Sequence, residues 1–137
     1  MYKKAVVGVD GSELSIKAIT QVLNLKGVIR EVDLLFVVDG SHMKVDFSDG
    51  WKGLGLSKAK EERLKHLEKE VIESGVCCNK HILRGDPAVG ITSFAAANQS
   101  DLIVLGSRGL NSLQQFILGS VSEKVLHTSP CTVLIIK

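Results

Sequence analysis

Residues 101–122, DLIVLGSRGLNSLQQFILGSVS, decide how this chain folds. Within them, residues 102–105 are an unbroken apolar run after an acidic residue, which is typical of a parallel strand buried on both faces. The run ends at Gly106, two residues separate that glycine from Gly109, and nine separate Gly109 from Gly119. A helical pattern follows. The stretch therefore predicts a strand, a glycine-rich turn and a helix.

The glycines and serines of this stretch bring hydrogen-bond donors close to any bound anion. Glycine allows the backbone to approach a ligand, and the first N–H groups of a helix have no partner inside it. Residues 106–109 and 119–122 are therefore two donor-rich segments that suit phosphate. By themselves, Gly106 and Gly109 fit a plain strand-to-helix turn as well as they fit a ligand site.

Apolar runs and helical periodicities alternate along the rest of the chain. The apolar runs predict strands at residues 4–9, 32–38, 76–83, 101–105 and 132–136. Helical spacing and capping residues predict helices at residues 12–26, 57–74, 87–98 and 119–127. Five strands that alternate with four helices predict an α/β fold with a parallel sheet and right-handed crossovers.

The composition is that of an ordinary globular domain. Hydrophobic residues make up 45% and charged residues 23% of the 137 residues, so we expect one domain over residues 1–137. The net charge of +2 is too small to indicate nucleic-acid binding. No apolar run approaches the ~18 residues of a membrane span, and no signal-peptide core follows Tyr2. We expect a cytoplasmic protein that does not bind membranes.

The cysteines and histidines show no metal-ligand or disulfide spacing. Cys77, Cys78 and Cys131 are an odd number without a paired Cys-x-x-Cys motif, which favours small buried side chains in a reducing compartment. The four histidines are His42, His66, His81 and His127. Because they are scattered, we predict no metal site.

Residues 39–56 are a long segment without sustained periodicity, rich in glycine, serine and aspartate. Segments of this length in compact domains are usually functional or disordered. Two interpretations stay open, a mobile flap near a ligand and a disordered insertion. Trp51 within it fits either stacking on a base or, more simply, anchoring the loop by packing.

The spacing of glycine, two residues, glycine, nine residues, glycine and serine in residues 106–120 resembles the nucleotide-binding signature of the universal stress protein family. The resemblance covers residues 2–136. It implies a doubly wound, Rossmann-like sheet of five parallel strands in the order 3-2-1-4-5 with four flanking helices, of the adenine nucleotide alpha hydrolase-like type. Such sheets bind ligands beyond the carboxyl ends of the strands where the order reverses, here between the first and fourth strands.

The resemblance also implies roles for individual residues, without any catalytic residue. The adenine and ribose side is implied to comprise Gly8, Val9, Asp10 and Val37, with Asp10 at the buried edge of the site. The ribose and inner-phosphate loop is implied to comprise Gly106, Ser107, Arg108, Gly109 and Asn111. The terminal-phosphate cradle is implied to comprise Gly119, Ser120, Val121 and Ser122. A Mg²⁺ ion would bridge the phosphates.

Two positions depart from the family pattern. Many nucleotide-binding relatives have proline where this chain has Gly8, and histidine or lysine often stands in place of Arg108. A third position has two explanations, since Asp86 fits the N-cap of a helix that begins at Pro87 and also resembles a ribose contact. Asp10 likewise fits either the ligand or the first turn of the following helix.

Three functions follow as hypotheses. The first is an ATP-binding stress-response module, with ATP, ADP or AMP resident and at most slow hydrolysis. The second is a slow ATP-cleaving enzyme that uses Asp10, and the third is a partner-binding module that has lost the nucleotide. The resemblance also implies a homodimer that pairs through the apolar strand at residues 132–136.

Overall fold

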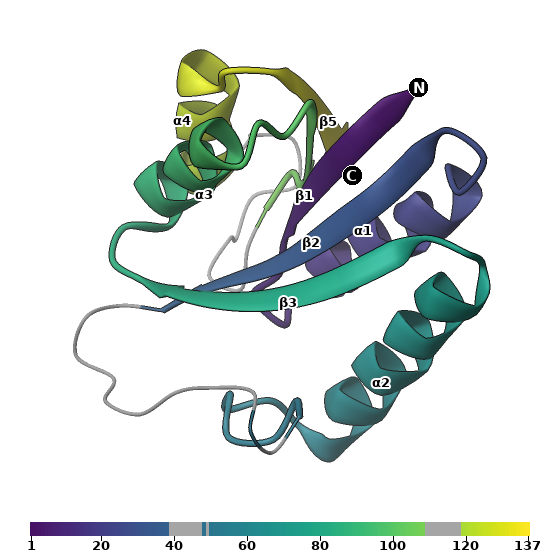
Figure 1. Cartoon of the computed structure of the whole chain (residues 1–137). Coiled ribbons are helices and arrows are strands. Elements are labelled where there is room, and N and C mark those ends of the chain that lie inside the picture. Colours follow the sequence, from purple (N-terminus) through teal and green to yellow (C-terminus); the bar gives the residue numbers. More distant parts are fainter. Residues whose placement is uncertain (39–47, 49, 109–118) are drawn as a thin grey trace.

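A computed structural model describes residues 1–38, 48, 50–108 and 119–137 of the chain. Strands and helices alternate through these residues (Figure 1). The strands are β1 (Tyr2–Gly8), β2 (Ile29–Val38), β3 (Cys77–Arg84), β4 (Leu102–Gly106) and β5 (Thr132–Ile136). The helices are α1 (Glu13–Asn24), α2 (Lys58–Glu73), α3 (Pro87–Ala97) and α4 (Ser120–Thr128).

The strands form one parallel sheet in the order β3-β2-β1-β4-β5. This confirms the α/β class and the strand order 3-2-1-4-5 that the resemblance implies. The order reverses between β1 and β4, where Val7 lies beside Val104. Both strands therefore end next to each other, at the edge where ligands of such sheets bind.

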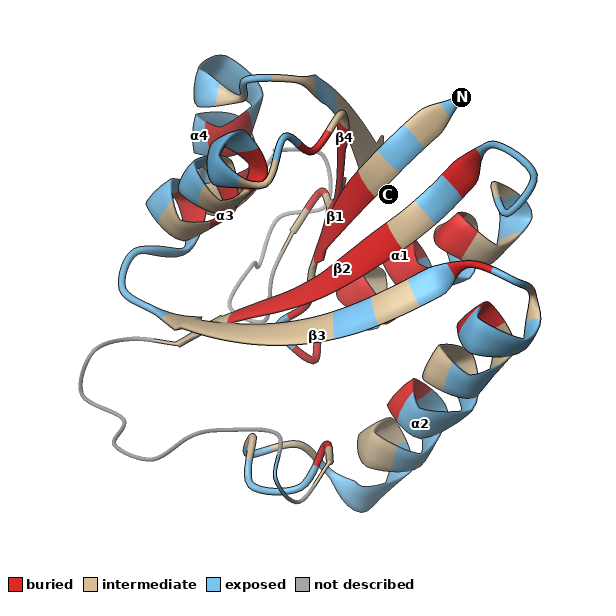
Figure 2. Cartoon of the chain, in the orientation of Figure 1, coloured by how far each residue is buried: buried red, intermediate tan, exposed pale blue. Residues whose placement is uncertain are grey.

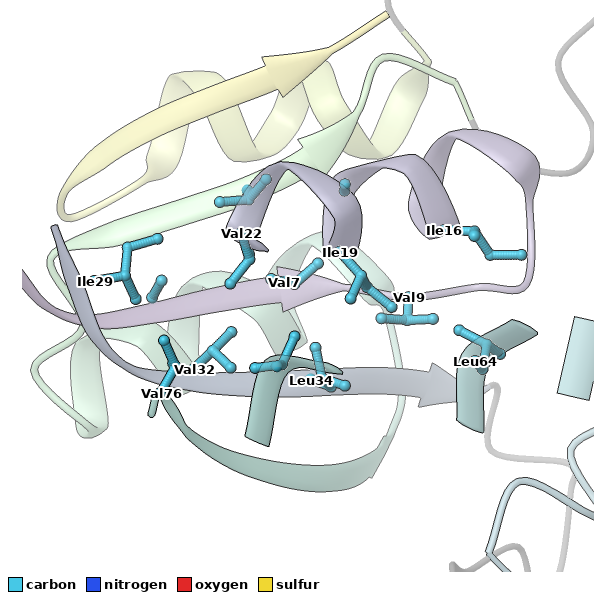
Figure 3. Packing of buried hydrophobic residues seen from close by; sticks show 14 of the residues in the cluster. Val7, Val9, Ile16, Ile19, Val22, Ile29, Val32, Leu34, Leu64 and Val76 are labelled. Carbon is cyan, nitrogen blue, oxygen red and sulfur yellow. The ribbon is translucent and has the colours of Figure 1, made fainter. Parts of the chain in front are cut away.

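The helices cover the two faces of the sheet and bury a core on each. On one face, α1 and α2 pack on the sheet, and Figure 3 shows Val7 and Leu34 of the sheet below Ile16 and Ile19 of α1, with Leu64 of α2 close by. On the other face, α3 and α4 cover a second cluster. Strands β1, β2 and β4 read as apolar runs because both of their faces are buried (Figure 2).

The helix starts follow the predicted capping residues. Ser12 accepts a hydrogen bond from Ser15 N at 3.2 Å and caps α1, and Ser57 caps α2 in the same manner. Asp86 Oδ2 accepts from Val89 N at 3.0 Å, so the N-cap interpretation of this residue is confirmed. The strand ends differ from prediction by up to three residues, since β2 begins at Ile29. Backbone pairing with β1 extends it beyond its apolar run.

The prediction of buried cysteines holds only in part. Cys77 is exposed, whereas Cys78 and Cys131 are partly buried, and all three are free thiols. Cys77 lies at the start of the edge strand β3, where alternate side chains face solvent. Burial raises the pKa of the Cys78 thiol to about 12, with a smaller contribution from the nearby Glu68 carboxylate.

Part of the long segment after β2 is packed against the domain. Trp51 is buried at 1% exposure, which confirms it as a packing anchor, and Leu54 and Leu56 pack on the core under α1 and α2. Residues 50–56 are thus not a disordered insertion. Residues 39–47 and 49 lie outside the described residues. Among the described helices, none has the length and apolar character needed to cross a membrane.

Candidate functional site

The turn after β4 packs directly on the first turn of α1. A Cβ atom added to Gly106 would lie 2.7 Å from the Cβ of Leu14 and 3.2 Å from its carbonyl carbon. No side chain fits into that space, so a glycine is required there. The carboxyl end of β4 and the amino end of α1 are consequently in contact.

Two hydrogen bonds join the end of β4 to the start of α4. Gly119 N donates to Ser107 O at 2.7 Å, and the Ser122 hydroxyl donates to Gly106 O at 2.6 Å. Residues 106–108 and 119–122, the described parts of the two donor-rich segments, therefore lie side by side. Because the Ser122 hydroxyl donates its hydrogen to Gly106 O, this side chain holds the start of α4 against the end of β4.

The amino end of α4 presents backbone N–H groups without a side-chain cap. Its N-cap residue is Gly119, and no side-chain hydrogen bond caps the helix among the described residues, in contrast to α1, α2 and α3. Ser120 is exposed and Val121 partly buried at this end. Uncapped N–H groups at a helix start attract anions because they carry partial positive charge and have no partner inside the helix, although Glu123 in the first turn of α4 offsets part of that charge.

Arg108 carries a buried donor at the edge of the described part of the chain. Its Nε atom is buried and has no hydrogen-bond partner among the described residues. The backbone just before it is fixed, since Ser107 is buried and its N–H donates to Ile136 O at 2.7 Å. A buried guanidinium nitrogen without an acceptor costs free energy. An anionic ligand beside it would remove that cost.

The turn after β1 brings Asp10 to the same edge of the sheet. Its Oδ1 accepts from Ser12 N at 2.9 Å, and its own N–H donates to Ser15 Oγ at 3.3 Å. Gly11 has a φ of +81°, which favours glycine. Asp10 is exposed, so its expected position at a buried edge is wrong. The turn projects it beyond the strand, while Ser12 caps the helix.

Gly8 and Val9 are engaged in packing and in the sheet. A Cβ atom on Gly8 would lie 2.5 Å from Leu105 Cδ2 and 3.2 Å from Ile91 Cδ1, so a larger residue here would require both side chains to shift. Val9 is buried, and its N–H donates to Leu35 O at 2.9 Å. The lining role of both residues stays a prediction.

Of the remaining predicted site residues, Val37 belongs to the described part of the chain, whereas Gly109 and Asn111 do not. Val37 is partly buried near the end of β2, and its side chain lies against Gly90 of α3. Gly109 and Asn111 lie outside the described residues. Sequence reasoning missed Ser15. Its buried hydroxyl accepts a hydrogen bond from Asp10 N and donates one to Ser12 O. A serine on the otherwise apolar face of α1 was the available signal.

A shallow cavity of about 300 Å³ lies elsewhere, between α1 and α2. Its lining residues are Thr20, Glu62, Arg63, His66 and Leu67. Arg63 already pairs with Glu13 at 2.7 Å, and His66 pairs with Glu70. None of these residues belongs to the predicted ligand set. The buried Nε of Arg108, which has no hydrogen-bond partner within residues 1–38, 48, 50–108 and 119–137, makes the strand-end edge the better candidate.

Comparison with known proteins matches this fold and sequence to one family. The model of the Universal stress protein family matches residues 1–137. Universal stress protein MJ0531 from Methanocaldococcus jannaschii is 36% identical over 141 residues, covering 100% of this chain and 83% of the relative.

Solved structures agree. Protein MJ0577 of the same organism superimposes with a TM-score of 0.79 at 31% identity, covering 100% of this chain and 96% of that one. A universal stress protein family protein from Arabidopsis thaliana with AMP bound gives a TM-score of 0.65 at 25% identity, covering 98% and 90%. With its glycine-rich turns joined at the reversal point of the sheet, the chain belongs to the universal stress protein family.

Proposed function

We propose that the protein binds an adenine nucleotide where β1, β4 and α4 meet and acts as a nucleotide-dependent signalling module in a stress response. One observation carries the proposal. The hydrogen bond from Gly119 N to Ser107 O holds the uncapped start of α4 next to Arg108, whose buried Nε has no acceptor among the described residues. Phosphate oxygens would satisfy both groups.

The phosphates and the nucleoside would occupy different parts of the edge. The start of α4 and the turn after Gly106 would hold the phosphates, with Gly109 and Asn111 as further proposed contacts. The turn after β1, with Asp10, would face the nucleoside. Val37 would line the same side. Each charge-assisted hydrogen bond contributes about 1.5–3 kcal/mol, and micromolar affinity needs about 8 kcal/mol in all.

The class of ligand is supported by a relative. The Arabidopsis family member was solved with AMP bound. We infer ATP as the ligand of this chain, with ADP and AMP as alternatives, because the donor-rich segments around Arg108 and Gly119 extend over more than one turn.

A divalent ion at this site would be coordinated mainly by the phosphates of the bound nucleotide. Residues 9–12, 106–108 and 119–122 contain one carboxylate, that of Asp10, and its Oδ1 already accepts from Ser12 N. Glu123 follows in the first turn of α4. Mg²⁺ prefers several oxygen ligands and keeps some of its water. Phosphate oxygens would therefore hold most of its coordination shell. We infer slow hydrolysis at most, because the turn uses Asp10 to fix its own backbone.

We also propose that the protein forms a homodimer through β5 and acts in the cytoplasm. β5 is at one edge of the sheet, and its Val133, Leu134 and Ile135 are only partly buried. An apolar edge strand pairs readily with a second copy. The three free thiols suit a reducing compartment.

The nucleotide proposal is tested by calorimetric titration of the purified protein with ATP and Mg²⁺. We expect micromolar binding, and Gly119→Asp should abolish it by placing a carboxylate at the start of α4 while the fold is kept. Gly27→Asp is the matched control, because a Cβ on Gly27 has no described atom within 4 Å. Unchanged affinity in Gly119→Asp would contradict the proposed site.

A further inference from the structure

Three elements hold the indole of Trp51. Its Nε1 donates to Glu68 Oε1 of α2 at 3.3 Å, and its ring centroid lies 5.6 Å from that of Phe36 in β2. Lys80 of β3 places its Nζ 5.3 Å from the Trp51 ring and 3.1 Å from Glu68 Oε2. At 1% exposure the indole is fixed by packing on several sides.

The chain that follows Trp51 lies over the core and runs directly into α2. Leu54 and Leu56 both pack on the cluster under α1 and α2. Ser57 then caps α2 by accepting from Lys60 N at 3.3 Å. The segment is therefore fixed at both ends, by Trp51 on one side and by the helix cap on the other.

Leu56 reaches from this segment to the turn after β1. A Cβ atom on Gly11 would overlap Leu56 Cδ2, and both described atoms near that position belong to Leu56. Gly11 separates Asp10 from Ser12, the two residues joined by the hydrogen bond that closes the turn. Leu56 consequently packs on the backbone of the turn that presents Asp10.

A second link joins the same elements but contributes little. Arg63 of α2 pairs with Glu13, in the first turn of α1, at 2.7 Å. The two side chains are 54% and 69% exposed, so solvent screens their attraction. The apolar contact between Leu56 and Gly11 is therefore the stronger of these two links to the start of α1.

We propose that Leu56, held in place by Trp51, is a positioning residue that fixes the turn around Gly11 for the nucleoside half of the bound nucleotide. This rests on the proposed function. A glycine turn that projects beyond its strand has backbone freedom that a ligand must remove on binding. Packing by Leu56 removes that freedom beforehand, which raises affinity without any contact to the ligand.

The test compares Leu56→Ala with Leu67→Ala. Leu67 packs on the same cluster from α2, and it supplies none of the described atoms near Gly11. Calorimetric titrations with ATP and with AMP should show Leu56→Ala weakening both by the same factor, about tenfold. The factor is equal because both ligands share the nucleoside. Leu67→Ala should bind like the wild type, and Leu56→Met should recover most of the affinity.

Amide hydrogen exchange provides a readout that needs no nucleotide. The N–H of Ser12 donates to Asp10 across the turn, and its exchange should be at least severalfold faster in Leu56→Ala than in the wild type or Leu67→Ala. Unchanged exchange would overturn the positioning role whatever the ligand. Equal loss of affinity in both alanine variants would also overturn it. If the wild type binds no nucleotide but exchange accelerates as expected, the proposed function fails and the positioning of the turn stands.

Discussion

The hydroxyl of Ser122 donates to the carbonyl oxygen of Gly106 at 2.6 Å, and this bond ties the first turn of α4 to the end of β4. Ser122 is 4% exposed. The contact is thus a partly buried link between two segments that are separated in the sequence by residues 107–121.

We expect Ser122→Ala to destabilise the protein by about 1–2 kcal/mol, because the partly buried carbonyl of Gly106 loses its partner. Equilibrium unfolding in urea measures the change. Ser120→Ala is the control, since Ser120 is exposed at the same helix start, and its free energy of unfolding should change by less than about 0.5 kcal/mol. Equal effects of the two substitutions would show that the Ser122 bond is not formed.

Replacing Arg108 should separate ligand binding from stability. Arg108→Met removes a buried nitrogen that has no acceptor among the described residues, so the free protein should be as stable as the wild type or slightly more stable. ATP affinity should fall about tenfold through loss of a charge-assisted hydrogen bond. AMP affinity should fall as well, because Arg108 belongs to the loop that is proposed to hold the inner phosphates. Calorimetry and thermal unfolding of both proteins measure these effects, and undiminished ATP binding would remove Arg108 from the site.

His81 should contribute more to stability than His66. His81 Nε2 lies 2.8 Å from Oδ1 of Asp33, a carboxylate that is only 7% exposed within β2, and the imidazole packs on the ring of Phe94. His81→Ala would leave the buried carboxylate without this partner and should cost about 1–3 kcal/mol. His66 pairs with Glu70 on the open surface of α2 at 72% exposure. His66→Ala should cost less than about 0.5 kcal/mol in the same urea titration.

The two neighbouring cysteines should differ in reactivity. Cys77 is exposed, whereas burial raises the pKa of Cys78 to about 12. At pH 8 iodoacetamide should modify Cys77 first and reach Cys78 only in urea, because the thiolate is the reactive form. Peptide mass spectrometry identifies which of the cysteines is modified. The raised pKa also means that Cys78 favours folding below its ordinary value of 9.0, and this contribution is lost as pH rises towards about 12. Cys78→Ala should lack that part of the pH dependence.

The dimer proposal predicts a mass of two chains by light scattering at micromolar concentration. Thr132→Lys should shift the protein to one chain, because Thr132 is exposed on the edge strand β5 and a lysine there opposes pairing. Ser93→Lys places the same charge on an exposed position of α3 and should leave the mass unchanged. A single-chain mass for the wild type contradicts the proposal.

Much of the fold follows from local sequence. The apolar runs in β1, β2 and β4 are readable because strands buried on both faces need no polar alternation, and the cap at Asp86 is readable because its side chain bonds within three residues. Strand order has no such local signal. The strand order was predicted from the family resemblance, because the spacing of the strands along the chain does not indicate which of them are neighbours in the sheet.

The errors concern contacts between distant residues. The exposure of Asp10 depends on how far its turn projects beyond the sheet, and the packing of residues 50–56 depends on Trp51 meeting α2 and β3. Neither relationship leaves a periodic pattern. The ligand contact predicted for Gly8 stays a prediction, and the packing of Leu105 and Ile91 beside it is a further contact between distant residues that the sequence does not indicate.

The two outer strands of the sheet are chemically unlike. β3 carries Lys80 and Arg84, whereas β5 reads TVLII. Pairing of β5 with β3 of the next copy is a heterologous contact that can continue from copy to copy and form a filament. Pairing of β5 with β5 is an isologous contact that closes as a dimer. The charged side chains of β3 disfavour the first arrangement. The chemistry of one outer strand would therefore limit the size of the assembly that we propose for the other.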